Sequence, residues 1–196
     1  MIIGIAGKIG SGKDLVGRMI SYIYDNANIS YENYKNTPNT EFMHKRHFAD
    51  SLKMVCSILT DIDYEHFSDR DFKNQPIPWL KDSPSIRKLL QDVGTCLKEK
   101  IDPDLWIKLL FKYTETWDMV IIPDVRFQNE VDAIHDQEGI VIHLIRDDHF
   151  NTPTDIKQHI SETELDTISN FDFEINNNGS EEDLFDSVLK VCNKML

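Results

Sequence analysis

Short apolar runs along this chain alternate with segments in which apolar residues recur every three or four positions. The runs predict strands at 1–6, 41–49, 119–123, 140–145 and 173–175. The segments with helical spacing lie at 14–23, 52–59, 86–97, 102–113 and 127–137, with further helices from 161 and 180 onward. Strands separated by helices predict an α/β fold, a doubly wound parallel sheet of about five strands with helices on both faces. Such sheets bind ligands at the carboxyl ends of their strands.

Polar residues mark the starts of two of these helices. In DPDLWIKLLFKY, Asp102 is expected to cap the helix and Pro103 to take its first position, where no N–H is needed. Ser180, followed three residues later by Asp183, is close to a capping box. The two pairs therefore predict where these helices begin.

Three polar segments interrupt the pattern. Residues 26–40 are expected to form a loop. Residues 61–84 have no clean period and three prolines, which predicts an insertion over one edge of the core, in a position to close over a ligand. Residues 147–160 form a candidate lid. The chain of 196 residues is expected to fold as a single domain.

Composition narrows the class of protein. A net charge of −13 disfavours binding along DNA or RNA, although a few cations in one cleft suffice for a small phosphorylated ligand. No apolar run is long enough to span a membrane, and no basic region precedes the first apolar residues, so a cytoplasmic protein without a membrane partner is expected. Cys56, Cys96 and Cys192 lack metal or redox spacing and are expected to be buried, reduced thiols.

The stretch GKIGSGKD, residues 7–14, matches the phosphate-binding pattern G-x-x-x-x-G-K-[ST] except at Asp14. Gly10 and Gly12 let the backbone turn its N–H groups inward, and the following helix adds its positive N-terminal end. Lys13 is expected to reach the β- and γ-phosphates of a nucleotide. Asp14 can hold Mg²⁺ in place of the usual hydroxyl, but it adds negative charge beside the phosphates.

Charged residues follow two other predicted strands. Asp124 and Arg126 are expected just past the end of the strand 119–123, where they face the phosphate loop or, alternatively, cap the next helix. Arg146 follows the strand 140–145 at the base of the candidate lid. An arginine at this place can neutralise charge on a phosphoryl group in transfer. The alternative is that the segment is a solvated, charged loop. The lid also carries His149, Lys157 and His159, for which the sequence indicates no partner.

Six motifs occur together in the order GKIGSGKD, FADSLK, IRKLLQDVGT, DPDLW, PDVRFQNE and HISETELD. They resemble the deoxynucleoside monophosphate kinases of tailed bacteriophages, which belong to the P-loop kinase superfamily. In that family Asp commonly follows the loop lysine, so Asp14 becomes part of the resemblance. The resemblance implies ATP as phosphoryl donor, Mg²⁺ as cofactor and small nucleotides as ligands, and leaves open whether the protein is a homodimer.

The resemblance also implies site residues. ATP would be bound by Lys8, Gly10, Ser11, Gly12, Lys13, Asp14, Leu15 and, near adenine, Asn177. The acceptor nucleotide would be bound by Asp50, Lys53, Arg87, Gly94, Thr95, Trp106, Asp124, Arg126 and Glu130. Asp14 and Asp124 are the candidate metal ligands, and Lys13, Arg126 and Arg146 the candidate catalytic residues. Without the resemblance, a core position is the preferred interpretation of Trp106. Lys98 or Lys100 would replace an arginine that relatives often carry after the GT pair.

The implied reaction converts ATP and a deoxynucleoside monophosphate into ADP and the diphosphate. A monophosphate with a second pKa near ~6 is already largely ionised at neutral pH, so positioning and charge neutralisation are expected to dominate. Two alternatives stay open. One is a related kinase of the dephospho-CoA or phosphomevalonate type, with Asp50 as base, and the other a noncatalytic nucleotide-binding switch. Switch GTPases usually carry D-x-x-G after a strand, where this chain continues PDVR.

Overall fold

The computed structural model describes residues 1–37, 44–69, 71–147 and 164–195. The chain forms two compact units. The first, here called the sheet unit, combines Met1–Arg46 with Thr116–Leu196, and the second, the helical unit, is His47–Glu115. The 69-residue helical unit is thus inserted between the first and second strands of the sheet.

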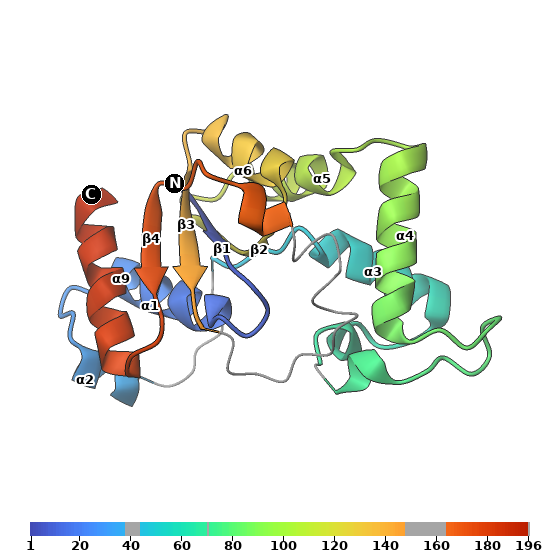
Figure 1. Ribbon diagram of the computed structural model, residues 1–196, viewed down its shortest axis with the longest axis horizontal. Helices are drawn as coiled ribbons and strands as arrows, with labels where there is room; N and C mark the ends of the chain where they lie inside the picture. The colour runs from blue at the N-terminus through green and yellow to red at the C-terminus, as the bar shows by residue number, and fades with distance from the viewer. Residues whose placement is uncertain (38–43, 70, 148–163, 196) are drawn as a thin grey trace. The chain divides into compact units, whose positions relative to one another are not determined.

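A parallel sheet forms the centre of the sheet unit (Figure 1). Its strands β1 (Ile2–Ala6), β2 (Val120–Val125), β3 (Ile140–Ile145) and β4 (Phe173–Asn176) lie in the order β2-β1-β3-β4, and every neighbouring pair is parallel. The crossovers required by this order confirm the predicted parallel α/β architecture, and β1, β3 and β4 lie within one residue of their expected positions.

The sheet has four strands in the described part of the chain, not the expected five. The fifth candidate was 41–49, of which 44–49 are described. There, Lys45 forms an isolated parallel bridge with Ile121, with bonds from Ile121 N to His44 O (2.8 Å) and from Arg46 N to Ile121 O (3.0 Å). Pairing at a single residue holds this segment beside the edge of β2 without extending it into a strand.

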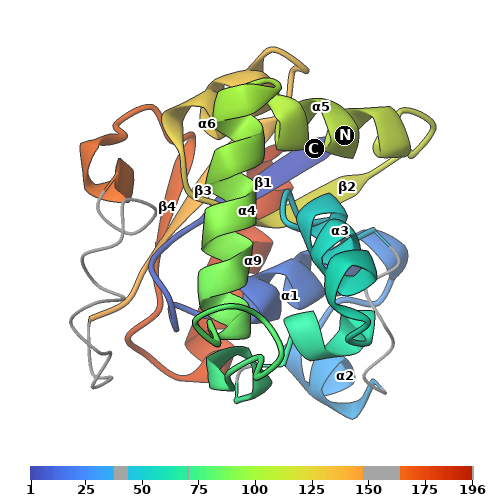
Figure 2. The same ribbon diagram turned by 90° about the vertical axis from the view of Figure 1, so that its right-hand side faces the viewer.

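Helices cover both faces of the sheet (Figure 2). Helices α1 (Lys13–Asp25) and α9 (Glu181–Met195) pack together on one face, where they bury Ile3, Ile5 and Ile142. Helix α6 (Gln128–His135) packs on β1 and β3 from the other side. The hydrophobic centre of the sheet is therefore closed from both sides, as the alternation of strands and helices predicts.

A short helix, α2 (Tyr31–Asn36), occupies the segment that was expected to be a loop. The Ser30 hydroxyl caps it by accepting a hydrogen bond from Asn33 N at 3.2 Å. Its Tyr31 and Tyr34 rings pack against Phe185 of α9, with ring centroids 5.8 and 5.3 Å away. The loop prediction for 26–40 was wrong for residues 31–36, because two tyrosines at helical spacing form the apolar face of an otherwise polar segment.

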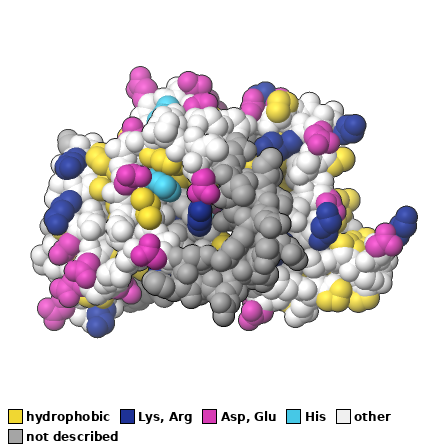
Figure 3. Space-filling model, viewed as in Figure 1, with side chains coloured by type: hydrophobic (Ala, Val, Ile, Leu, Met, Phe, Trp, Pro, Cys, Tyr) yellow, Lys and Arg dark blue, Asp and Glu magenta, His cyan; other side chains and the backbone are white. Residues whose placement is uncertain are grey.

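The start of α9 agrees with the expected capping box. Asp183 N donates to Ser180 Oγ at 3.2 Å, and Ser180 N donates to the Asp183 carboxylate at 2.9 Å. Acidic side chains gather at this end of α9, as Figure 3 shows, and they include Glu181, Glu182 and Asp183 of its first turn. Negative charge at a helix N-terminus stabilises the helix through its dipole.

The helical unit consists of α3 (Asp50–Thr60), the 3₁₀ turns η1 (Tyr64–Phe67) and η2 (Phe72–Asn74), α4 (Ile86–Lys100) and α5 (Leu105–Thr114). Its core contains Cys56, Phe67, Ile77 and Ile86. Phe67 and Ile77 come from the irregular segment 61–84, so this segment supplies part of the core of its own unit.

Two details of the helical termini differ from expectation. Helix α5 begins at Leu105 with Asp104 as its N-cap, and Asp102 accepts a hydrogen bond from Asp104 N (2.8 Å) in the turn before the helix. The predicted cap at Asp102 and the predicted first helical position at Pro103 were therefore both wrong. The helix expected from residue 161 corresponds, in its described part, to the 3₁₀ turn η3 (Glu164–Thr167).

Across the described ranges, the chain has no helix long and apolar enough to cross a membrane.

The cysteines divide into two kinds. Cys56 and Cys192 are buried, and this burial raises the pKa of each thiol to about 11. Cys96 is exposed on α4, so the expectation of three buried thiols was wrong for this residue. The error arises because Cys96 belongs to the polar face of an amphipathic helix, which the residue type alone does not reveal.

Candidate functional site

The loop between β1 and α1 has the backbone that a phosphate loop requires. Gly10 and Gly12 adopt φ values of 80° and 100°, a region that other residues rarely occupy. A Cβ atom on Gly12 would lie 2.7 Å from Nδ2 of Asn177, so this position also excludes a side chain for lack of space. The loop then passes directly into α1, whose first residue is Lys13 and whose N-cap Gly12 has no side chain to cap it. This arrangement favours an anion at the start of the helix.

Lys13 lies across the loop that precedes it. Its ammonium donates to the carbonyl oxygens of Gly7 at 2.6 Å and Lys8 at 2.9 Å. The positive charge is therefore held over the loop itself, as a phosphate-binding lysine must be.

Asp14 is mostly exposed, and one carboxylate oxygen lies 3.4 Å from the ammonium of Lys45. Lys45 reaches this place because its backbone bridges to Ile121 at the edge of β2. The negative charge that Asp14 adds to the loop is thus partly compensated within the same unit. Sequence reasoning missed Lys45, because the bridge that positions it leaves no periodic pattern.

Ser11 and Asn177 meet beneath the loop. The Asn177 side chain is buried, and its amide donates to the carbonyl oxygen of Ser11 at 2.7 Å. The Ser11 hydroxyl is also buried, and among the described residues it has no hydrogen-bond partner. Leu15 lies in the first turn of α1 and packs against the core, whereas Lys8 is exposed and forms an ion pair with Asp166 at 2.8 Å.

Arg146 follows β3 at the same edge of the sheet. One of its guanidinium nitrogens lies 3.5 Å from the carbonyl oxygen of Gly10, at the outer limit of a hydrogen bond. The next residue, Asp147, exchanges two bonds with Asn178: its N–H donates to Asn178 Oδ1 at 2.8 Å, and Asn178 Nδ2 donates to its carboxylate at 2.9 Å. The structure thus brings the predicted Arg146 to the phosphate loop.

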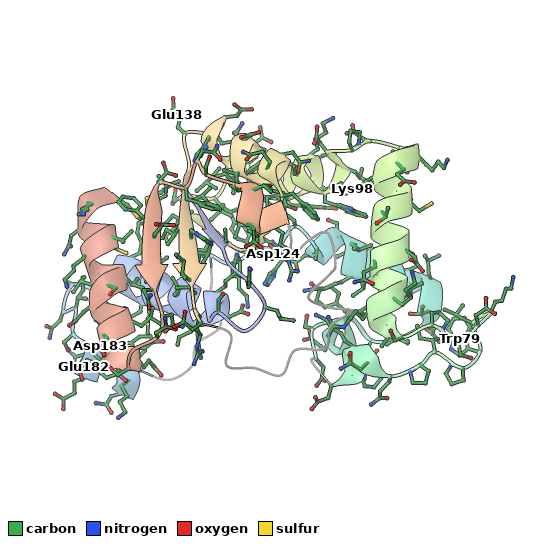
Figure 4. All side chains as sticks on the ribbon, viewed as in Figure 1. Trp79, Lys98, Asp124, Glu138, Glu182 and Asp183 are labelled. Carbon is green, nitrogen blue, oxygen red and sulfur yellow. The ribbon has the colours of Figure 1, made fainter. Side chains whose placement is uncertain are left out.

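Asp124 lies inside β2 rather than past its end, which corrects the predicted boundary (Figure 4). The pairing of β1 with β2 shifts between Gly4↔Ile122 and Ala6↔Val125, so β2 has one extra residue opposite Ile5. Pro123 lies in this bulge, where a missing N–H is tolerated. The strand therefore continues to Val125, and Arg126 is the first residue after it.

Glu130 is buried and lies directly behind Arg126. Its carboxylate accepts hydrogen bonds from the backbone N–H groups of Arg126 at 2.7 Å and Phe127 at 3.1 Å. It therefore stabilises the turn that presents Arg126 at the start of α6, a role in addition to the acceptor contact that the resemblance implies.

In the helical unit, Asp50 and Lys53 are the centre of a partly buried polar cluster. One Asp50 carboxylate oxygen accepts from the Tyr64 hydroxyl at 3.0 Å and lies 3.4 Å from the Lys53 ammonium, which in turn lies 3.3 Å from the Ser68 hydroxyl. The other oxygen accepts from His47 N at 2.9 Å.

The environment of Asp50 lowers the pKa of its carboxyl group. Burial raises this pKa, but hydrogen bonds from His47 and the positive charges of His47 and Lys53 outweigh burial and hold the pKa well below its ordinary value. Sequence reasoning missed His47, Tyr64 and Ser68. Tyr64 and Ser68 come from a segment without periodicity, and His47 lies in the turn that leads into α3. In the sequence, the polar character of these three residues was the one feature that could have indicated a shared site.

The other predicted acceptor residues are spread over α4 and α5. Arg87 is partly exposed and donates to the Asn74 side chain at 3.3 Å, and Thr95 is exposed. A Cβ on Gly94 would lie 3.0 Å from Leu52, so this glycine permits the close packing of α3 on α4. Trp106 is buried, which agrees with a core position. Lys98 is partly buried on α4 (Figure 4).

The metal prediction is only partly supported by the donor atoms present. The described residues contain no group of three or more His, Cys, Asp or Glu side chains able to hold an ion. Mg²⁺ in phosphoryl-transfer sites, however, is commonly bound by one or two carboxylates together with waters and substrate phosphates. The exposed Asp14 carboxylate at the loop fits such a ligand. His149, Lys157 and His159 of the candidate lid lie outside the described residues.

Comparison with known sequences identifies the family. The sequence model of the family described as "Deoxynucleotide monophosphate kinase" matches residues 28–188. The chain belongs to this family. A putative deoxynucleotide monophosphate kinase of Acanthamoeba polyphaga mimivirus is 30% identical over 96% of this chain and 94% of its own length. The deoxynucleotide monophosphate kinase of Enterobacteria phage T4 is 35% identical over 56% of this chain and 46% of its own length.

The match to the family model begins after the phosphate loop, at residue 28. The assignment of the loop therefore rests on its own sequence and backbone geometry. Among solved structures, the shikimate kinase from Aquifex aeolicus has a TM-score of 0.47 and 12% sequence identity over 99% of this chain and 96% of that chain.

Proposed function

We propose that this protein transfers the γ-phosphoryl group of ATP to a deoxynucleoside monophosphate and releases ADP and the diphosphate. The observation that carries the proposal is the phosphate loop at the carboxyl end of β1, with Lys13 held over it, in a chain of the deoxynucleotide monophosphate kinase family. Phosphoryl transfer requires positioning and charge neutralisation more than covalent help from the protein.

The donor residues act on the phosphates of ATP. The backbone of Lys8, Gly10, Ser11, Gly12 and Leu15 forms the loop and the first turn of α1, and Lys13 supplies positive charge to the β- and γ-phosphates. Arg146 neutralises charge on the group in transfer, which its position near Gly10 supports. Asn177 is a further residue of the proposed ATP site.

Mg²⁺ is the expected cofactor, with Asp14 as its ligand and Asp124 as a second candidate. When bound, the ion neutralises phosphate charge and orients the β- and γ-oxygens. Lys45, 3.4 Å from Asp14, holds the carboxylate at the loop.

The acceptor residues bind the monophosphate nucleotide. Arg126 grips the phosphate with two parallel hydrogen bonds, since a guanidinium matches phosphate geometry. Asp124, Glu130 and Asp50 accept hydrogen bonds from the sugar, the base or bound water, whereas Lys53 and Arg87 add positive charge. Gly94, Thr95 and Trp106 line the base and sugar pocket. Ionisation of the acceptor near neutral pH removes the need for a protein base.

We further propose that the chain acts as one kinase domain in the cytoplasm, with 61–84 as a substrate-covering insertion and 147–160 as a lid. Its substrates are small nucleotides and not nucleic-acid polymers, which the net charge of −13 supports. A homodimer is compatible with this function.

A coupled ADP-release assay tests the proposal directly. It would compare deoxynucleoside monophosphates, ribonucleoside monophosphates, dephospho-CoA, phosphomevalonate and water as acceptors, each with ATP and Mg²⁺. Turnover with one or more deoxynucleoside monophosphates is expected. Turnover with dephospho-CoA or phosphomevalonate alone would favour the related small-molecule kinases, and ATP binding without any acceptor turnover would favour a noncatalytic switch.

A further inference from the structure

Three consecutive asparagines, residues 176–178, occupy the end of β4 and the turn that follows it, and their side chains differ in burial. Asn176 and Asn178 are exposed, whereas Asn177 is 7% exposed. Asn176 Oδ1 accepts from Asn178 N at 3.0 Å and so stabilises the turn itself. The buried Asn177 side chain is directed instead to the phosphate loop, 166 residues earlier in the chain.

The hydrogen bond between Asn177 and the loop can have only one direction, with Asn177 as the donor. The Ser11 carbonyl can only accept a hydrogen bond, so the amide nitrogen of Asn177 must face it, at 2.7 Å. The backbone N–H of Asn177 donates to Ile145 O, also at 2.7 Å. Asn177 therefore joins the end of β3 to the loop, because its backbone N–H bonds to β3 and its side chain bonds to the loop.

The bonded carbonyl occupies a sensitive position in the loop. Ser11 immediately precedes Gly12, the N-cap of α1, and Gly12 leaves just enough room for the Asn177 amide. The peptide that links Ser11 to Gly12 has its carbonyl oxygen held by Asn177, and this fixes the direction of the N–H at its other end. Preorganised N–H groups of this kind bind phosphate oxygens without further ordering.

We propose that Asn177 is a positioning residue of the donor site, which holds the Ser11–Gly12 peptide so that the loop binds the phosphates of the nucleotide. This inference rests on the proposed ATP-binding function and specifies how Asn177 serves it. Direct adenine recognition, as implied by the family resemblance, would use the polar atoms of the Asn177 side chain on the base. Its amide nitrogen donates to the protein backbone instead.

The two roles predict different losses of binding. A residue that recognises adenine contributes to ATP binding and to the preference for ATP over GTP, but not to the binding of a phosphate chain without a nucleoside. A residue that positions the loop contributes equally to both ligands and leaves base preference unchanged. Inorganic tripolyphosphate with Mg²⁺ is therefore the probe that separates them.

The experiment uses the full chain with Asn177→Asp and Asn177→Ala, and measures dissociation constants for ATP and tripolyphosphate by isothermal titration. Both substitutions remove the donor, and Asn177→Ala does so without adding charge. Asn176→Asp is the matched control, since its carboxylate can still accept from Asn178 N while adding the same charge to the same turn. We expect both Asn177 variants to weaken ATP and tripolyphosphate by the same factor, roughly tenfold, and the control to bind both normally.

Hydrogen exchange provides a second readout that does not need nucleotide. In Asn177→Ala, amide exchange in residues 7–16 should be faster than in the wild type and in Asn176→Asp, with unchanged exchange in β1. If Asn177→Asp does not fold, Asn177→Ala decides the comparison. If neither folds, a side chain at this position serves the fold as a whole, and the inference is wrong.

The other outcomes are equally decisive. Weaker ATP binding with normal tripolyphosphate binding, or a lost preference for ATP over GTP, would assign Asn177 to adenine and overturn the inference. Unchanged binding of both ligands would overturn it too. A wild-type protein that binds tripolyphosphate but phosphorylates no deoxynucleotide would contradict the proposed function alone, because the binding comparison would still decide the role of Asn177.

Discussion

At the scale of single residues, charge in the donor site is concentrated on side chains held by backbone groups. Lys13 donates to two loop carbonyls, and Arg146 lies near a third, so each cation has a defined place before any nucleotide binds. Such preorganisation lowers the cost of ordering these side chains in the transition state.

Lys13→Ala should remove most turnover and leave the fold intact. The lysine charge is directed at the developing charge on the phosphoryl group, so kcat should fall about a hundredfold or more. Of its two carbonyl partners, Lys8 is exposed and can bond to water while Gly7 is buried, so the melting temperature should fall only modestly. Steady-state kinetics and circular dichroism would check both, and near-normal turnover in a folded variant would remove Lys13 from the catalytic residues.

Arg126→Lys should affect the acceptor and not the donor. Lysine keeps the charge but cannot form two parallel bonds to a phosphate, so KM for the deoxynucleoside monophosphate should rise while ATP affinity stays nearly unchanged. The Glu130 cap bonds to backbone groups and is retained in the variant. Titration with each nucleotide separately would test this, and selective loss of ATP binding would move Arg126 to the donor site.

At the scale of elements, the ends of β3 and β4 are joined by the reciprocal bonds between Asp147 and Asn178. These bonds fix the backbone next to Arg146, at the place where the chain leaves the sheet. The position of Arg146 therefore depends on a turn more than thirty residues later in the chain.

Asn178→Ala should lower kcat without a matching change in ATP affinity. The loss of both bonds frees Asp147, and with it Arg146, but the exposed position limits the effect to roughly three- to tenfold. Asn193→Ala, at an exposed position of α9, serves as a control with normal kinetics expected. An unchanged kcat in Asn178→Ala would show that the turn does not position Arg146.

The second element-scale prediction concerns the Asp50 cluster of the helical unit. Asp50→Asn should destabilise the protein by about 1–3 kcal/mol at pH 7, because Lys53 and His47 lose a buried anionic partner. The pKa of Asp50 is lowered in the folded state, so its contribution is complete above the unfolded value of 3.8 and is lost as the pH falls further. The difference between wild type and variant should therefore shrink below about pH 4.

Urea unfolding at several pH values between 3 and 7 would measure this difference. The control is Asp92→Asn, which removes an exposed ion pair with Lys88 on α4 and should cost little. A difference that does not change with pH would contradict the assigned cause of the lowered pKa.

At the scale of the whole molecule, the predicted residues divide between the two units. All ATP residues belong to the sheet unit, as do Asp124, Arg126 and Glu130 of the proposed acceptor site, whereas Asp50, Lys53, Arg87, Gly94, Thr95 and Trp106 belong to the helical unit. ADP should therefore slow amide exchange in residues 7–16 and 176–178, and a deoxynucleoside monophosphate should slow exchange in 124–130 and in 47–115. Exchange measured by mass spectrometry with each ligand alone tests this division, and protection of 47–115 by ADP alone would contradict it.

The sequence predicted those parts of the molecule that depend on local pattern. The glycine loop between an apolar strand and a periodic helix predicted β1, the loop and α1, and Ser180 with Asp183 predicted the start of α9. What escaped prediction depends on contacts between distant segments. Tyr31 and Tyr34 form a helix through packing on Phe185, and the bulge that extends β2 arises from its pairing with β1.

The same limit applies to the site. Lys13 and Arg146 were identified from motifs or strand ends, but Lys45 reaches Asp14 only through a bridge to β2. Likewise, the amide nitrogen of Asn177 donates to the Ser11 carbonyl, a contact that the family resemblance does not imply. Which group a polar side chain contacts is determined by tertiary packing, which the residue type does not specify.

The unequal burial of the three cysteines makes the native chain suitable for site-specific chemical labelling. Cys56 and Cys192 are buried with raised pKa values, and both features suppress reaction with a maleimide, whereas Cys96 is exposed. A fluorophore on Cys96 would sit beside Thr95 on α4, without any cysteine having to be added or removed. Because Thr95 is a proposed acceptor residue, the emission of this fluorophore is expected to change when a deoxynucleoside monophosphate binds, while the proposed donor site in the sheet unit carries no label.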